Sequence, residues 1–162
     1  DGNQPAMGER CFVADNAAVI GDVVMGDDCS VWYGAAVRGD SSPIRIGCRV
    51  NIQDNATIHN NETSQVSIGD DVSIGHNAVV HGATLGNAVL GGMGAVVLDH
   101  AVVGEGSVIG AGAVVTGGVV IPPCSLVMGV PAKVVRSVAP GVNLDNAATY
   151  VQRKDIYLEN GE

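Results

Sequence analysis

Aliphatic side chains recur at every sixth position over most of this chain, with one shift of frame at Leu85. The fifth position of each six-residue unit is small or β-branched almost throughout. A period of six does not fit a helix, whose period is 3.6, but suits short strands joined by tight corners. The repeat therefore predicts stacked coils, each burying its aliphatic residue beneath the next. The aliphatic positions are Met25, Val31, Val37, Ile46, Ile52, Ile58, Ile68, Ile74, Val80, Leu85, Val97, Val103, Ile109, Val115, Ile121 and Val127.

The repeat resembles the hexapeptide motif of left-handed parallel β-helix proteins, in which three hexads form one triangular coil. The left hand is implied by this resemblance alone, because the usual crossover rule favours the right. The 23 glycines suit tight corners, and the single Phe and single Trp suit a narrow core. Gly91 stands where an aliphatic residue is expected, so we expect a local loss of packing there.

The predicted fold is all-β, a left-handed parallel β-helix domain over residues 1–135. Two insertions interrupt the hexads, three extra residues in 39–45 and four in 60–67, and both are expected to be loops. Residues 136–162 are expected to form a C-terminal α-helix and tail that pack on the β-helix. The helix is predicted over 142–158, with an imperfect apolar stripe formed by Val142, Leu144, Ala148, Val151 and Ile156.

Charge and composition limit the classes of binding partner and the cell compartment that we expect. The formal net charge of −9 disfavours nucleic acid and anionic membrane surfaces. We find no 18-residue apolar run and no signal-peptide pattern, so we expect a cytoplasmic protein without membrane insertion. The four cysteines show no C-x-x-C spacing, and Cys29 occupies a small inward position, which favours a reduced core residue.

Three histidines lie within the repeat. His59 and His81 follow the inward Ile58 and Val80, so they take the same place in their coils. Their interval of 22 residues is one coil of three hexads plus the four-residue insertion, which predicts a separation of one rung, roughly 4.8 Å. Two imidazoles at that spacing can share one metal ion, with nitrogen-to-metal bonds of about 2.1 Å.

His76 belongs to the preceding hexad and therefore to another face of the triangle. It cannot easily complete the same site within one chain. A threefold homotrimer would bring the His76 face of one subunit to the His59 and His81 face of its neighbour, which predicts three equal sites at subunit interfaces. Trp32 and Tyr33 are expected to pack at that interface. His100 lacks comparable support and is expected at a surface corner.

Three blocks in this order, VWYGAAVRGD at 31–40, NIQDNATIH at 51–59 and IGHNAVVHG at 74–82, resemble the gamma-class carbonic anhydrase family. The resemblance covers most of the repeat region. It implies that His59, His76 and His81 bind a metal across a trimer interface. It further implies that Gln53 orients a water or bicarbonate and that Asn51 lines the pocket. Arg38 and Asp40 match a pair linked to trimer assembly and the active site, and Asp54 matches a structural acid.

The activity implied is reversible hydration of carbon dioxide to bicarbonate by a metal-bound hydroxide. Three neutral imidazoles leave one coordination position of the metal open, and the metal lowers the pKa of a water held there. Zinc is the first expectation, although iron(II) or cobalt would accept the same ligands. The best-known active members of the family carry a longer acidic loop that relays protons. Here Glu62 is the single carboxylate of the loop 60–67, so it is either the proton shuttle or a simply solvated side chain.

Other functions use the same residues. An acyl-CoA thioesterase-like hydrolase would direct the same activated water at a thioester. A hexapeptide acyltransferase would use one histidine as a base with acetyl-CoA, but this leaves the other two histidines without a role. A catalytically weak trimeric assembly protein would keep the site without rapid turnover, since fold alone does not fix function.

Overall fold

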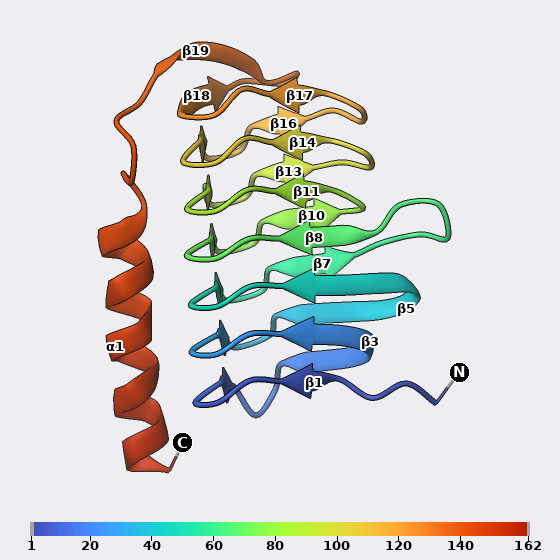
Figure 1. Ribbon diagram of the computed structural model, residues 1–162, viewed down its shortest axis with the longest axis vertical. Helices are drawn as coiled ribbons and strands as arrows, with labels where there is room; N and C mark the ends of the chain where they lie inside the picture. Colours follow the sequence, from blue (N-terminus) through green and yellow to red (C-terminus); the bar gives the residue numbers. More distant parts are fainter. Residues whose placement is uncertain (1, 162) are drawn as a thin grey trace.

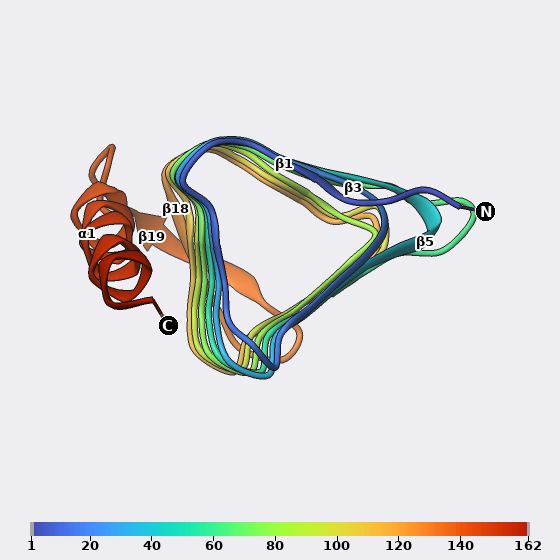
Figure 2. The same cartoon turned by 90° about the horizontal axis from the view of Figure 1, so that it is seen from below.

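The computed structural model describes residues 2–161, which form a triangular prism of stacked coils with one helix beside it (Figure 1). Viewed from below, the coils superpose on a triangle, and the helix lies outside one of its sides (Figure 2). The chain runs counter-clockwise in that view as it recedes from the N-terminus, so the solenoid is left-handed. The predicted β-helix with a C-terminal helix is confirmed.

The strands on each side of the prism pair in parallel. The one exception among the named strands is an antiparallel strand at the end of the side next to the helix. The side next to the helix is called the helix face. It comprises β2 (Phe12–Val13), β4 (Ser30–Val31), β6 (Asn51–Ile52), β9 (Ser73–Ile74), β12 (Leu90–Gly91), β15 (Val108–Ile109), β18 (Ser125–Met128) and the antiparallel β19 (Lys133–Ser137).

The other two sides form one continuous sheet, because two long strands bend around the corner between them. These are β3 (Ala18–Met25) and β5 (Ala36–Ile46). The second face consists of the first halves of these two strands, followed by β7 (Thr57–His59), β10 (Val79–His81), β13 (Val96–Val97) and β16 (Val114–Val115). Beside their second halves, the third face contains β1 (Ala6–Met7), β8 (Val66–Ile68), β11 (Thr84–Leu85), β14 (Val102–Val103) and β17 (Val120–Ile121).

The core fills the triangle with the predicted aliphatic residues, all of which are buried. Fifth-position residues, which are small or β-branched, are buried as well, for example Ala56, Val72 and Ala113. Gly91 lies in this column between Ile74 and Ile109, and a Cβ added there would meet only ordinary contacts. The predicted gap in packing is therefore present. Cys29 is a buried free thiol, as expected.

The two insertions differ in structure. Residues 39–45, expected to be a loop, are instead the bend of β5, because the strand keeps its pairing with β3 on both sides of a register shift. Residues 60–67 do leave the ladder, and they re-enter it in β8. Both insertions project from the same corner of the prism (Figure 2).

Helix α1 (Leu144–Asn160) begins and ends two residues later than predicted and descends along the helix face (Figure 1). Its buried residues are Ala147, Tyr150 and Lys154, so the predicted apolar stripe is wrong. Val142, Leu144 and Ile156 are about half exposed. No helix within residues 2–161, α1 included, is long and apolar enough to cross a membrane.

Aromatic side chains join α1 to the first coils. Trp32 is buried against Phe12, with their ring centroids 5.0 Å apart, and Tyr150 and Tyr157 of the helix meet its edges. The expectation that Trp32 lies at a subunit interface is therefore wrong, because its own helix covers it. Tyr33 remains more exposed, with its ring centroid 6.3 Å from that of Tyr157.

The fully buried Lys154 fixes the same end of α1. Its Nζ lies 3.1 Å from Asp28 Oδ1 and also pairs with Asp155. Asp28 in turn accepts two hydrogen bonds from Arg10. A buried ammonium is costly unless it is paired, so this ion pair selects one position of the helix along the face.

Candidate metal centre

A ladder of adjacent strands stacks three predicted site residues on the second face. Strand β7 pairs with β5 below and β10 above, which sets His59 opposite Arg38 and His81 opposite His59. The inward neighbours Val37, Ile58 and Val80 pair in the same order, so the outward column follows from the buried one. The predicted spacing of one rung between the two histidines is confirmed.

The two imidazoles face each other directly. His59 Nδ1 lies 3.2 Å from His81 Nε2, and the ring centroids are 5.2 Å apart at an interplanar angle of 63°. Their side chains are 19% and 28% exposed, so one edge of the pair is open to an incoming ligand.

A carboxylate holds the outer nitrogen of each ring. Asp40 Oδ1 lies 3.0 Å from His59 Nε2, and Asp99 Oδ1 lies 2.8 Å from His81 Nδ1. The Arg38 guanidinium beside Asp40, with a smaller effect of His59, holds the pKa of that carboxyl below its usual range. The Ser64 hydroxyl, with a smaller effect of His81, does the same for the pKa of Asp99. Both acids are therefore carboxylates, which only accept hydrogen bonds.

This arrangement assigns the protons on the rings. His59 donates through Nε2 and His81 donates through Nδ1, so in the neutral rings His59 Nδ1 and His81 Nε2 carry lone pairs. When both rings are neutral, these two lone pairs face each other at 3.2 Å, an arrangement that suits a cation between them. Two ligand nitrogens about 2.1 Å from a tetrahedral ion are roughly 3.4 Å apart. The pair therefore fits a metal ion of the zinc type.

His76 lies elsewhere in the chain. It follows β9 at the corner where the helix face meets the second face, whereas His81 ends β10 at the opposite corner of the second face. Five residues of extended chain separate them by up to about 16 Å. Within residues 2–161, no three His, Cys, Asp or Glu side chains gather in a way that could hold a metal ion. The predicted separation of His76 from the pair is confirmed.

His76 nevertheless shares a feature with the pair. Its Nδ1 lies 3.0 Å from Asp54 Oδ2, and both side chains are about 40% exposed. Asp54 is thus a half-exposed partner of a histidine, and all three predicted ligands carry a carboxylate on one nitrogen.

The predicted pocket residues Asn51 and Gln53 lie on the helix face. Gln53 Nε2 donates to Asn51 Oδ1 at 2.9 Å, and Asn51 Nδ2 donates to Ser73 Oγ at 2.8 Å. Asn146 of α1 donates to the same hydroxyl. Both predicted residues are buried, and Gln53, beside Asp54 in sequence, belongs with the His76 corner and not with the pair. Within one chain the predicted site residues therefore form two separate groups, one around His59 and His81 and one around His76.

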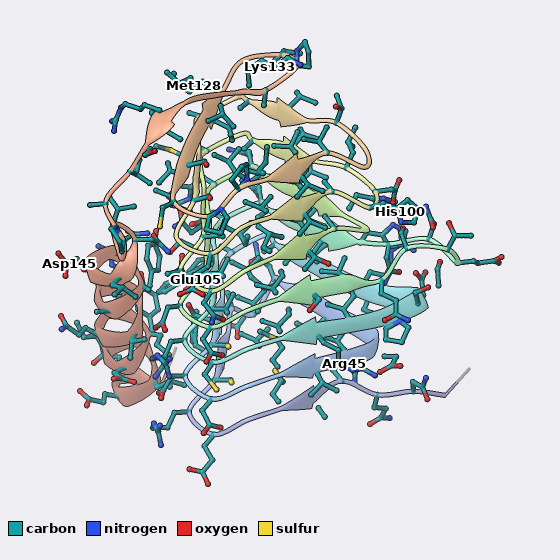
Figure 3. All side chains as sticks on the ribbon, turned by 45° about the horizontal axis from the view of Figure 1, so that its top comes forward. Arg45, His100, Glu105, Met128, Lys133 and Asp145 are labelled. Carbon is teal, nitrogen blue, oxygen red and sulfur yellow. The ribbon has the colours of Figure 1, made fainter. Side chains whose placement is uncertain are left out.

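The loop 60–67 lies beside the pair. Its Glu62 is exposed, as expected for either a proton shuttle or a solvated side chain. His100 is also exposed, at a corner with φ of 62°, and Figure 3 shows it on the side of the molecule that carries this loop. The surface position predicted for His100 is confirmed.

Sequence reasoning missed Asp99, Ser64 and Asn61. Asp99 immediately precedes His100 and lies one coil above Gly82. Counting one coil onward from the His81 block would have found it. The frame shift at Leu85 obscured the count, since Val80 pairs with Val97, 17 residues later. Nothing in the sequence indicated that Ser64 and Asn61 would turn back to this acid.

No family model matches the chain. A protein named carbonic anhydrase from Geobacillus kaustophilus is 40% identical to it over 161 residues, covering 99% of this chain and 86% of that protein. Gamma carbonic anhydrase 2, mitochondrial, of Arabidopsis thaliana is 40% identical over 138 residues, covering 82% and 50%. Among solved structures, a putative acetyltransferase from Bacillus cereus is 38% identical, with a TM-score of 0.92 and coverage of 96% and 92%.

The similarity extends over the full prism and includes the blocks that contain the three histidines. Identity of this level over nearly the whole chain establishes common descent with the Geobacillus protein. The chain belongs to the gamma-class carbonic anhydrase-like family of hexapeptide-repeat proteins.

Proposed function

We propose that this protein is a metal-dependent lyase that interconverts carbon dioxide and bicarbonate. The observation that carries the proposal is the pair of ring nitrogens 3.2 Å apart, each ring held by a carboxylate on its other nitrogen. The relatives named carbonic anhydrase add to it. Zinc is the first candidate for the ion, and iron(II) or cobalt suits the same nitrogen ligands.

A homotrimer would complete the site. His59 and His81 lie at one corner of the second face, and His76 lies at the other. Contact between unlike corners of neighbouring subunits would supply two ligands from one chain and one from the next, together with Gln53 and Asn51. A threefold axis closes such a head-to-tail contact into a ring.

Side chains of this protein would divide the remaining work. The ion, when bound, would supply Lewis acidity toward water. Asp40 and Asp99 would keep the ligand rings oriented. The hydrogen bond to Asn51 fixes the Gln53 amide so that its Oε1 faces away from Asn51, where it would accept the hydroxyl of bicarbonate. Glu62, exposed on the adjoining loop, would take the proton released on hydration.

The test is the hydration rate of carbon dioxide by protein reconstituted without oxygen with zinc and, separately, with iron(II). His81→Ala should abolish tight metal binding and hydration, while His100→Ala removes an exposed histidine outside the pair and should preserve both. The core depends on the inward aliphatic residues, so both variants should fold. Equal metal content in the two variants would refute the assignment of the pair as ligands.

A second candidate, acyl transfer or thioester hydrolysis, is favoured by the putative acetyltransferase that shares this fold at 38% identity. Release of free coenzyme A from acetyl-CoA, with and without an acceptor, measures it directly. Release that depends on His81, without hydration of carbon dioxide, would replace the lyase with this activity. Stoichiometric metal with neither activity would favour an assembly role.

A further inference from the structure

The two insertions converge on the outer nitrogens of the histidine pair. The bend at 39–45 contains Asp40, which holds His59. The loop 60–67 supplies two donors to Asp99, which holds His81: Ser64 Oγ at 2.7 Å and Asn61 Nδ2 at 3.2 Å from Asp99 Oδ1. Each departure from the six-residue repeat thus ends in a support for one imidazole.

The loop has a defined shape and is not a solvated excursion. Asn61 Oδ1 accepts hydrogen bonds from the backbone N–H and the hydroxyl of Thr63, both at 2.9 Å. Ser64 is only 3% exposed. These contacts turn the chain back so that both Ser64 and the Asn61 amide point at the same carboxylate oxygen.

The backbone at Gly82 passes close to Asp99 and Ser64. Gly82 follows His81 with φ of +56°, and a Cβ at that position would overlap both Ser64 Oγ and Asp99 Oδ1. Its carbonyl accepts the backbone N–H of His100 at 2.7 Å, which anchors the corner that carries Asp99. Loop, acid and histidine therefore form one close-packed group.

Hydrogen bonds also join the loop to the bend. The fully buried Asn60 donates to the Ser42 carbonyl at 2.7 Å and accepts the Ser42 backbone N–H at 3.2 Å. Ser42 Oγ donates to the Asn61 carbonyl at 2.7 Å. The supports of the two histidines are consequently parts of a single structure.

We propose that Asp99, held by Ser64 and Asn61, is a positioning residue for His81, and that the loop 60–67 serves chiefly as its buttress. Asp99 accepts the Nδ1 proton, which fixes the tautomer and the plane of the ring and directs the Nε2 lone pair at His59 Nδ1. This role rests on the proposed metal site, because its purpose is to present a ligand nitrogen. It differs from that of Asp40, whose support comes from Arg38.

The first measurement is made on metal-free protein. Long-range proton–nitrogen NMR of ¹⁵N-histidine-labelled chain reports which ring nitrogen of His81 is protonated. The expected result is a single Nδ1–H tautomer in the native protein and a mixture containing the Nε2–H form in Asp99→Ala. Asp99→Asn keeps an acceptor oxygen for Nδ1, so it should restore most of the Nδ1–H form. Asp15→Asn makes the same chemical change at an exposed corner and should leave the tautomer unchanged.

The second measurement is the dissociation constant of Zn²⁺ by chelator competition, with the absorption spectrum of bound Co²⁺ as a report on ligand geometry. Removing such a support from a ligand histidine costs about 10- to 100-fold in metal affinity, so Asp99→Ala should lose that much and Asp99→Asn less. Ser64→Ala removes one buttress while keeping the acid and should lose a few-fold. Should Asp99→Ala fail to fold, Ser64→Ala and Asp99→Asn carry the test.

Two failures are distinguishable. Native protein that binds neither Zn²⁺ nor Co²⁺ would overturn the proposed function, and the tautomer of His81 would still decide whether Asp99 positions the ring. Native protein that binds metal while Asp99→Ala keeps the native tautomer, affinity and Co²⁺ spectrum would overturn the role of Asp99 alone.

Discussion

Gly91→Ala should stabilise this protein. Gly91 is buried in the inward column between Ile74 and Ile109, and its added Cβ would lie 3.6 Å from Ser73 O and 3.8 Å from Ile74 Cδ1. Both distances are ordinary contacts, so no atom has to move. Restricting the unfolded chain contributes about 0.4–1 kcal/mol, and burying a methyl contributes about 0.8 kcal/mol. The free energy of unfolding should therefore rise by about 1–2 kcal/mol.

The adjacent Gly92→Ala provides a matched control, because its Cβ would lie 2.6 Å from Ile109 O and 2.7 Å from Ala111 N. Backbone atoms would have to shift, which should cost about 1–3 kcal/mol. Urea unfolding followed by circular dichroism, at one fixed protein concentration, measures both changes. A loss of stability in Gly91→Ala comparable to that in Gly92→Ala would refute the account of an underfilled core at this rung.

Three further predictions concern charge, proton transfer and subunit sharing. Arg10 lowers the pKa of Asp28 to about 2, against about 3.9 in an unfolded chain. The stabilisation that ionised Asp28 gives the folded protein is therefore present above about pH 4 and lost as the pH falls toward 2. The free energy of unfolding of Asp28→Asn, measured by urea unfolding between pH 6 and 2, should therefore fall less between pH 4 and 2 than that of the native protein. Glu62→Gln should slow hydration by roughly 10²-fold or more in weak buffer if Glu62 is the shuttle, with recovery in added imidazole; unchanged rates would show a solvated side chain. Mixed trimers of His76→Ala and His59→Ala subunits should regain metal sites that neither variant forms alone, and stable hybrids without metal would exclude ligands shared between chains.

The hexad pattern predicts most of the fold because the same residues form the core and define the register. Once Ile58 and Val80 point inward, alternation along the strand forces His59 and His81 outward, and parallel pairing stacks them. The separate place of His76 follows in the same way. These relations depend on local geometry and period, which a sequence states directly.

Contacts that depend on tertiary packing could not be predicted in this way. An outward aromatic such as Trp32 gives no sign of whether a neighbouring subunit or its own helix covers it. The buried face of α1 contains Lys154, whose hydropathy predicts a solvent-exposed position. Its burial is explained by its ion pairs with Asp28 and Asp155. The hydrogen bonds of Ser64 and Asn61 to Asp99 depend on how a loop folds back, and the sequence offers no period to count within that loop.

The contact between α1 and the first coils has a consequence for synthesis. The aromatic cluster of Phe12 and Trp32 is completed by Tyr150 and Tyr157, which leave the ribosome more than a hundred residues later. Each new coil can pair with the preceding coil during translation. The apolar surface of Phe12 and Trp32, however, stays uncovered until translation is nearly finished. Nascent chains therefore expose an aggregation-prone apolar surface for most of their elongation, and contacts this distant in sequence form slowly. Premature termination after the last coils but before the helix would yield a stacked but uncovered solenoid, a natural substrate for chaperones.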